Sequence, residues 1–161
     1  MGNTFTSESA ILNQVVAQLA SVTGFNADTV FVAATVEWLD GAPGDRYIEV
    51  IPSIATDKNA AGEIGEVEDT FTVCLFWRLY SDQAQRDTKR IADATNGALV
   101  ALANIEASLT NCTLAGLALK ACLPERREDF ERPPVDLPGW VMVRRRYKVG
   151  WAYSFPGQHV S

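Results

Sequence analysis

Apolar and charged residues alternate along the last part of the chain, from Gly139 to about Tyr153 (GWVMVRRRYKVGWAY). Successive side chains of a strand point to opposite faces, so the pattern predicts one long strand with an apolar face and a basic face. Arg145 is the only charge on the predicted apolar face. At roughly 3.3 Å per residue this strand reaches about 50 Å, more than twice an ordinary strand. A small domain cannot cover it alone, so we expect its edge to pair with another subunit, as in an assembly protein.

Two segments have helical periodicity. In the first, Ser7 to Val22, an apolar stripe recurs at helical spacing, Thr6 or Ser7 can cap the start, and Gly24 ends it. The second begins at Ser81 or Asp82 and runs to about Leu109. Gly97 lies inside it and favours a break, because glycine costs roughly 1 kcal/mol relative to alanine in a helix.

The remaining apolar runs predict strands. Val30–Leu39 and Tyr47–Ile54 flank a strong turn cluster and predict an antiparallel hairpin. Further strands are expected at Glu68–Tyr80 and Leu114–Leu123. Two segments are expected to lack packed structure, namely residues 55–67, an acidic exposed loop or mobile hairpin tip, and residues 124–138, a proline-rich extended connection.

The resulting order is helix, three strands, helix, two strands. Strand–helix–strand alternation does not persist, which disfavours a doubly wound parallel sheet. We therefore predict a single α+β domain over residues 1–161, with a mainly antiparallel sheet, two α-helices packed on one face, and the order α-β-β-β-α-β-β.

Charge is unevenly distributed along a chain whose net charge is −6. One cluster is acidic: Asp57, Glu63, Glu66, Glu68 and Asp69. Basic residues gather near the C-terminus, and the candidates for an intersubunit interface there are Arg126, Arg127, Arg144, Arg146, Lys148 and Trp151. Opposite patches suit head-to-tail contacts in a ring, although two solvated faces give the same pattern. A phosphate-binding face is disfavoured, because strand alternation splits the arginine run and the chain is acidic overall.

Candidate chemistry is sparse. The single histidine, His159, lies near the end of the chain, so Ser–His–Asp and Cys–His arrangements lack a positioned base. Cys74, Cys112 and Cys122 have no metal-binding spacing and indicate small buried residues in a reducing compartment. We expect no catalytic residue, no metal and no cofactor, although an enzyme with isolated carboxylates leaves little trace in a sequence.

The N-terminus lacks a basic region followed by an apolar one, and no apolar run reaches the roughly 20 residues that span a bilayer. We expect synthesis in a cytoplasm and no membrane partner.

The layout resembles that of phage tail terminator proteins, the rings that cap a long tail tube and join it to the head. The resemblance runs from about Ser7 to Trp151. It is carried by the opening helix (AILNQVVAQL), a proline-marked strand (YIEVIPSI), a strand leading into a long helix (TFTVCLFWRLY, then DQAQRDTKRIADATNGALVALANI) and the basic-apolar final strand (VMVRRRYKVGW).

This resemblance implies a homohexameric ring in the virion, at the head–tail junction, without enzyme activity. The implied partners are other copies of the chain, the tail tube protein and a head-completion or neck protein, and DNA would pass through without specific binding. The acidic segment would be the channel wall or the tube-facing loop. Three alternatives stay open: another neck or head-completion connector, a non-viral α+β module that binds a partner strand at its long edge, and a small enzyme with a carboxylate site.

Overall fold

The computed structural model describes residues 6–39, 44–52, 56–61, 64–79, 86–110, 112–119, 121–133 and 139–154, and for residues 56–61, 64–67, 86–88 and 153–154 only the backbone. The helical elements are α1 (Glu8–Ala20), the π-helical segment η1 (Arg86–Ile91) and α3 (Ala98–Leu109). The strands are β1 (Val30–Val32), β2 (Arg46–Pro52), β3 (Thr56–Ala61), β4 (Ile64–Arg78), β5 (Leu123–Arg127) and β6 (Trp140–Ser154).

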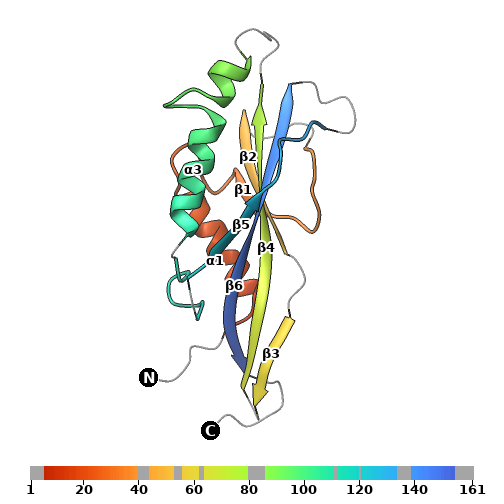
Figure 1. Cartoon of the computed structure of the whole chain (residues 1–161), viewed down its shortest axis with the longest axis vertical. Coiled ribbons are helices and arrows are strands. Elements are labelled where there is room, and N and C mark those ends of the chain that lie inside the picture. Colours follow the sequence, from red (N-terminus) through yellow and green to blue (C-terminus); the bar gives the residue numbers. More distant parts are fainter. Residues whose placement is uncertain are drawn as a thin grey trace.

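The strands form one sheet in the order β1-β2-β4-β6-β5, and β3 adds to β4 at one end (Figure 1). All described pairs of strands are antiparallel except β1 with β2, which is parallel with Val30 opposite Ile48. The α+β class and the mainly antiparallel sheet are therefore confirmed. The predicted antiparallel hairpin of the first two strands is wrong, because β1 ends at Val32 and pairs with β2 in parallel, which a short hairpin turn cannot connect.

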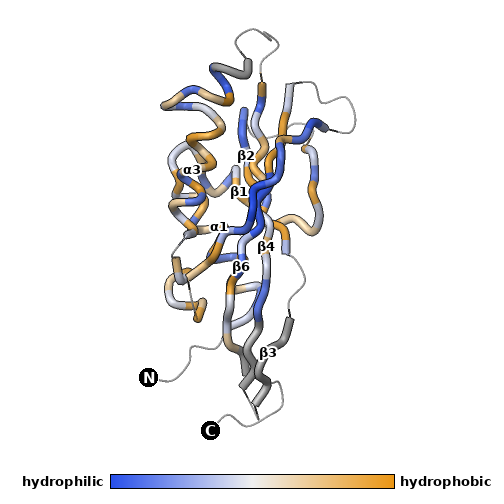
Figure 2. Tube along the Cα trace, in the orientation of Figure 1, coloured by the Kyte–Doolittle hydropathy of each residue, from blue (hydrophilic) through white to orange (hydrophobic). Residues whose placement is uncertain are grey.

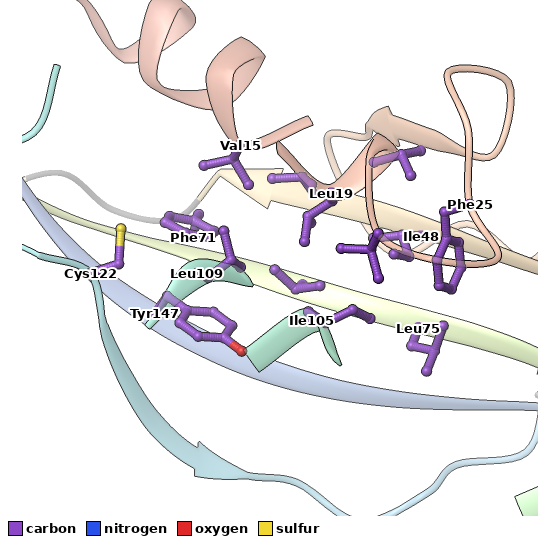
Figure 3. Packing of buried hydrophobic residues seen from close by; sticks show 14 of the residues in the cluster. Val15, Leu19, Phe25, Ile48, Phe71, Leu75, Ile105, Leu109, Cys122 and Tyr147 are labelled. Carbon is purple, nitrogen blue, oxygen red and sulfur yellow. The ribbon is translucent and has the colours of Figure 1, made fainter. Parts of the chain in front are cut away.

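We call the sheet face that α1 and α3 cover the near face, and the opposite one the far face. Both helices lie on the same side of the sheet in Figure 1, as predicted. Figure 3 shows Val15 and Leu19 of α1, Ile105 and Leu109 of α3 and Tyr147 of β6 packing toward one another. The start of α1 is also as predicted, since the Ser7 hydroxyl accepts a hydrogen bond from the backbone N–H of Ala10.

The far face has a smaller apolar cluster: Tyr47, Cys74, Phe76, Trp140 and Met142. The N–H of Ala33 still bonds to the carbonyl oxygen of Val50 in β2 at 3.1 Å. Residues 34–39, which we call the strap, then lie over the far-face cluster outside the sheet, and Val36, Trp38 and Leu39 pack against it. The predicted strand Val30–Leu39 is thus a strand for its first three residues and a cover for the remainder.

The long C-terminal strand is confirmed, but its edge is not free. β4 pairs with β6 along its whole length, from Arg78 opposite Trp140 to Ile64 opposite Ser154. Backbone groups also line the other margin of β6: β5 pairs with it around Tyr147, and further hydrogen bonds come from the N–H groups of Glu131, Leu119 and Thr6. The expectation that one chain cannot cover this strand, and that its edge pairs with another subunit, is therefore wrong.

The second predicted helix is interrupted. It splits into η1 and α3, and Gly97 immediately precedes α3. A Cβ at residue 97 would lie 2.5 Å from the carbonyl oxygen of Ile91 and 2.7 Å from the backbone nitrogen of Asp93, so the chain turns back on itself too tightly for a side chain there.

Two further elements differ from their predictions. The predicted strand Leu114–Leu123 is a turn through residue 119, with Leu114 and Ala115 at φ values of 51° and 58°. A strand instead begins at Leu123, inside the segment expected to be an extended connection. The acidic segment 55–67 contributes β3 and the start of β4, which form an antiparallel hairpin, one of the two forms expected for it.

Candidate assembly surfaces

The arginine run of β6 is divided between the two faces of the sheet, as its alternation predicts. On the near face, Arg145 Nη1 lies 2.6 Å from Glu106 Oε2 of α3, and its Nε donates to the carbonyl oxygen of Glu125 at 2.7 Å. On the far face, Arg144 lies 2.8 Å from a carboxylate oxygen of Glu128 and 2.7 Å from one of Glu131. These glutamates neutralise both arginines within one chain, which removes them from any phosphate-binding face.

The other predicted interface residues are placed as follows. Lys148 lies 3.8 Å from Glu125. Arg126, Arg127 and Arg146 are exposed, and the described ion pairs involve neither Arg126 nor Arg146.

Trp151 is only 6% exposed and belongs to the near-face core of a single chain. It is a core residue at this position, while an interface role for the five basic residues stays a prediction.

Four of the five acidic candidates lie among the described residues. Asp57 lies in β3 opposite Val67, Glu66 pairs with Lys58 and Ala152, and Glu68 is half-buried. Glu63 lies outside the described residues.

Asp69 is 1% exposed, which corrects its assignment to a channel-lining or tube-facing surface. Its Oδ1 accepts a hydrogen bond from the N–H of Thr70 at 2.8 Å. Burial raises the pKa of Asp69 to about 6, and the nearby Glu8 carboxylate adds to the shift. The position follows from alternation, since Asp69 shares strand parity with the core residues Phe71 and Val73 of β4.

A second buried carboxylate, Glu49, was not singled out from the sequence. It is fully buried on the far face, where its Oε1 accepts the N–H of Glu37 in the strap at 2.9 Å. Burial raises the pKa of Glu49 to about 7, and the Glu37 carboxylate contributes to the shift. The sequence did contain a signal for a buried carboxylate at this position, because Glu49 is the one charged residue inside an otherwise apolar strand, YIEVIP.

Glu49 lies opposite Cys74 on the neighbouring strand, and burial raises the pKa of that thiol to about 12. The thiol is therefore protonated, and a protonated thiol is a poor nucleophile.

Two open cavities border the near face. One, of about 290 Å³, lies between α3 and the β5–β6 margin and is lined by Leu99, Leu102, Val73, Tyr147 and the Glu106–Arg145 pair, among others. The other, of about 370 Å³, is lined by Leu79, Ile91, Phe130, Arg132 and Val141. Neither contains Glu49, Cys74 or Asp69, so the buried titratable groups do not open into either cavity.

Within the described part of the chain, no three His, Cys, Asp or Glu side chains are grouped to hold a metal ion. The helices described there are all too short or too polar to cross a membrane.

Comparison with known proteins rests on structure alone. No family model matches the sequence, and no curated protein matches it. One solved chain, 17% identical over 88% of this chain and 91% of its own, has a TM-score of only 0.45, which is too low to establish a shared fold. A chain from the virion of a native gene transfer agent particle matches with a TM-score of 0.53 and 11% identity, covering 92% of this chain and 99% of its own. At that identity the likeness shows a shared fold, and this chain has the fold of a protein found in a gene transfer agent virion.

Proposed function

We propose that this chain is a structural protein of a phage-like virion, and more specifically a tail terminator. In this role six copies form a ring that caps the tail tube and joins it to the head or neck. The observation that carries the proposal is the match to the gene transfer agent chain, because it takes in nearly the full length of both proteins. The finer assignment, to a tail terminator, rests on the resemblance of the sequence from about Ser7 to Trp151 to that family.

The closed β6 margin bears on the alternatives. A module that recruits a partner strand needs a long unpaired edge, and both sides of β6 are occupied within one chain. That alternative has therefore lost its main support. Another neck or head-completion connector remains the second candidate, since it also belongs to the virion.

Binding to purified tail tubes tests the proposal. We expect the full-length chain to bind only at tube ends, and electron microscopy of these ends to show a six-fold ring. Binding to emptied heads without tubes would instead identify a neck or head-completion protein. A chain that binds neither structure and stays monomeric would overturn the virion role.

The hairpin of β3 and β4 is the part we assign to the tube or the channel. Repulsion between carboxylates and DNA phosphates would let DNA slide past without sticking. Reversing Asp57 and Glu66 together (Asp57→Lys, Glu66→Lys) should lower the yield of infectious particles. Asp129→Lys, at an exposed acidic residue after β5, is the matched control and should leave the yield unchanged. Normal yield from the double variant would remove the hairpin from this role.

A further inference from the structure

The two helices on the near face present an almost uncharged surface. Together α1 and α3 contain only two charged residues, Glu8 and Glu106, in a chain that is 21% charged. Glu106 is neutralised by Arg145, and Glu8 lies at the very start of α1. The exposed residues, which we call the helix layer, are Ser9, Asn13, Ala17, Leu99, Ala103, Asn104 and Ala107.

The two helices that carry the helix layer are in contact. Gln18 of α1 donates a hydrogen bond from Nε2 to the carbonyl oxygen of Ser108 in α3 at 2.9 Å, so the helices are joined at that point. In Figure 2 orange and blue stretches alternate along α3, whereas the middle of β6 and the adjoining β5 are strongly hydrophilic. Leu99 is 39% exposed although it is a large apolar residue.

This composition is typical of an interface. A helix that faces water normally carries charged residues on its outer side, and the centres of protein interfaces are depleted of charge. Two adjacent helices of 13 and 12 residues cover about 400 Å², roughly half of what one partner contributes to a standard interface. The cavity beside α3 shares Leu99 and Ala103 with the layer and extends it toward β5.

We propose that the helix layer docks a second copy of this chain, an inference that rests on the proposed ring. Charge argues for this occupant. Each copy carries a net charge of −6, so copies repel one another wherever their carboxylates meet. The helix layer brings a neighbour into contact without facing carboxylates, apart from Glu8 at its margin.

A ring requires the layer to meet a different patch on the neighbouring copy, because like-to-like pairing closes at a dimer. Leu119 and Leu123 provide that patch. They are 39% and 58% exposed, and they lie along the outer margin of β6, where Leu119 bonds to Gly150 and Leu123 pairs with Lys148. We assign these leucines of one copy to the helix layer and adjoining cavity of the next.

Placing a charge on the layer tests the assignment. Ala17→Glu and Ala103→Glu should each weaken self-association by about tenfold or more, because a buried unpaired carboxylate opposes docking. Leu123→Asp should weaken self-association to a similar extent, because it places a carboxylate on the patch that meets the helix layer of the next copy. Ala34→Glu, at an exposed alanine of the strap, is the matched control. Association is measured by analytical ultracentrifugation and by counting rings on tube ends, with circular dichroism to verify that each variant is folded.

Mixing separates a head-to-tail contact from other arrangements. Ala103→Glu and Leu123→Asp copies each retain one intact patch, so an equimolar mixture should form dimers but no closed rings. If folded Ala17→Glu and Ala103→Glu copies form rings as the unchanged chain does, the helix layer is not the contact and the terminator role stands. If these variants form rings but no longer bind tubes, the layer meets the tube protein, which also overturns a second copy as its occupant. An unchanged chain that never forms rings, alone or on tubes, overturns both proposals.

Discussion

The two faces of this sheet are covered by different kinds of structure. The near face is covered by α1 and α3, whose backbone groups are satisfied within each helix, so the contact with the sheet is mostly apolar. The far face is covered by the strap, which has no ladder or helix for its own backbone. Side chains of β2 supply the missing partners: Glu49 accepts the N–H of Glu37, while the Tyr47 hydroxyl accepts the N–H of Leu39 and donates to the carbonyl of Glu37.

This difference explains where polar groups enter the interior. A helix can cover a sheet with leucine and isoleucine alone, but an irregular segment needs buried hydrogen-bonding side chains beneath it. The near face should therefore respond more strongly to lost volume, and the far face to lost hydrogen bonds. Each face holds one buried carboxylate, Asp69 on the near face and Glu49 on the far face, so both contribute to the dependence of stability on pH.

The largest effect is expected on the near face. Phe71 is fully buried in β4 and stacks on Tyr147 of β6 with ring centroids 5.6 Å apart. Phe71→Ala should lower the free energy of unfolding by about 3–5 kcal/mol, because it removes a large buried ring and leaves a cavity. Urea denaturation measures the loss. Thr23→Ala, at an exposed residue, is the control and should change little. A loss below about 1 kcal/mol for Phe71→Ala would show that the near-face core repacks.

The next effect belongs to the far face and depends on pH. The pKa of Glu49 is raised from 4.5 to about 7, so the folded chain holds more protons than the unfolded chain between these values. Stability therefore falls as pH rises from about 4.5 to 7 and is constant above that, with a total change of about 1–3 kcal/mol.

Glu49→Gln keeps an oxygen for the N–H of Glu37 and removes the titration. The slope between pH 6 and 7 should disappear in this variant, whereas Asp69, with its pKa near 6, should still contribute below that. Denaturant titrations at each pH measure the slope. A slope between pH 6 and 7 that persists in Glu49→Gln would place the titrating group elsewhere.

A smaller effect is expected from the hydroxyl beneath the strap. Tyr47→Phe retains the ring stacked on Phe76 at 4.3 Å and removes only the contacts to Leu39 and Glu37. The expected loss of stability is about 1 kcal/mol, the usual net value of a hydrogen bond with nearby access to water. Hydrogen exchange at the N–H of Leu39 should accelerate, while exchange in α1 should not. Equal acceleration in both would show that the strap opens only with the whole fold.

The near face was the predictable one. The stripe of Ile11, Val15 and Leu19 predicts α1, and the alternation around Arg145 predicts both β6 and the face that each of its residues occupies. These signals are periodic, and periodicity reflects burial of one side of a regular element.

The far face was not predictable in the same way. The run from Val30 to Leu39 is apolar throughout, because its first residues enter the sheet and its later ones lie over it. Both situations require apolar residues, so composition cannot separate them. Asp69 is a different case on the near face: alternation with Phe71 and Val73 indicates its burial, and only its inclusion in the acidic cluster assigned it to an exposed position. The prediction of a strand at Leu114–Leu123 was wrong for a different reason: leucine and alanine are as common in a turn packed on the core as in a strand.

The smallest effects are expected for the ion pairs of Arg144 and Arg145, adjacent residues of β6 whose side chains lie on opposite faces of the sheet. Arg145 joins Glu106 of α3 to the near face, and Arg144 joins Glu131 to the far face. Both pairs are partly exposed, so Glu106→Gln and Glu131→Gln should each cost less than about 1 kcal/mol, and the cost should shrink at 1 M salt, where screening acts within about 3 Å. Asp129→Asn, at an exposed acidic residue, is the control. Because helix α3 is already held by Ile105 and Leu109, we expect the two losses to be similar. A loss several times larger for Glu106→Gln would show that the near face, too, depends on a polar contact to hold its cover in place.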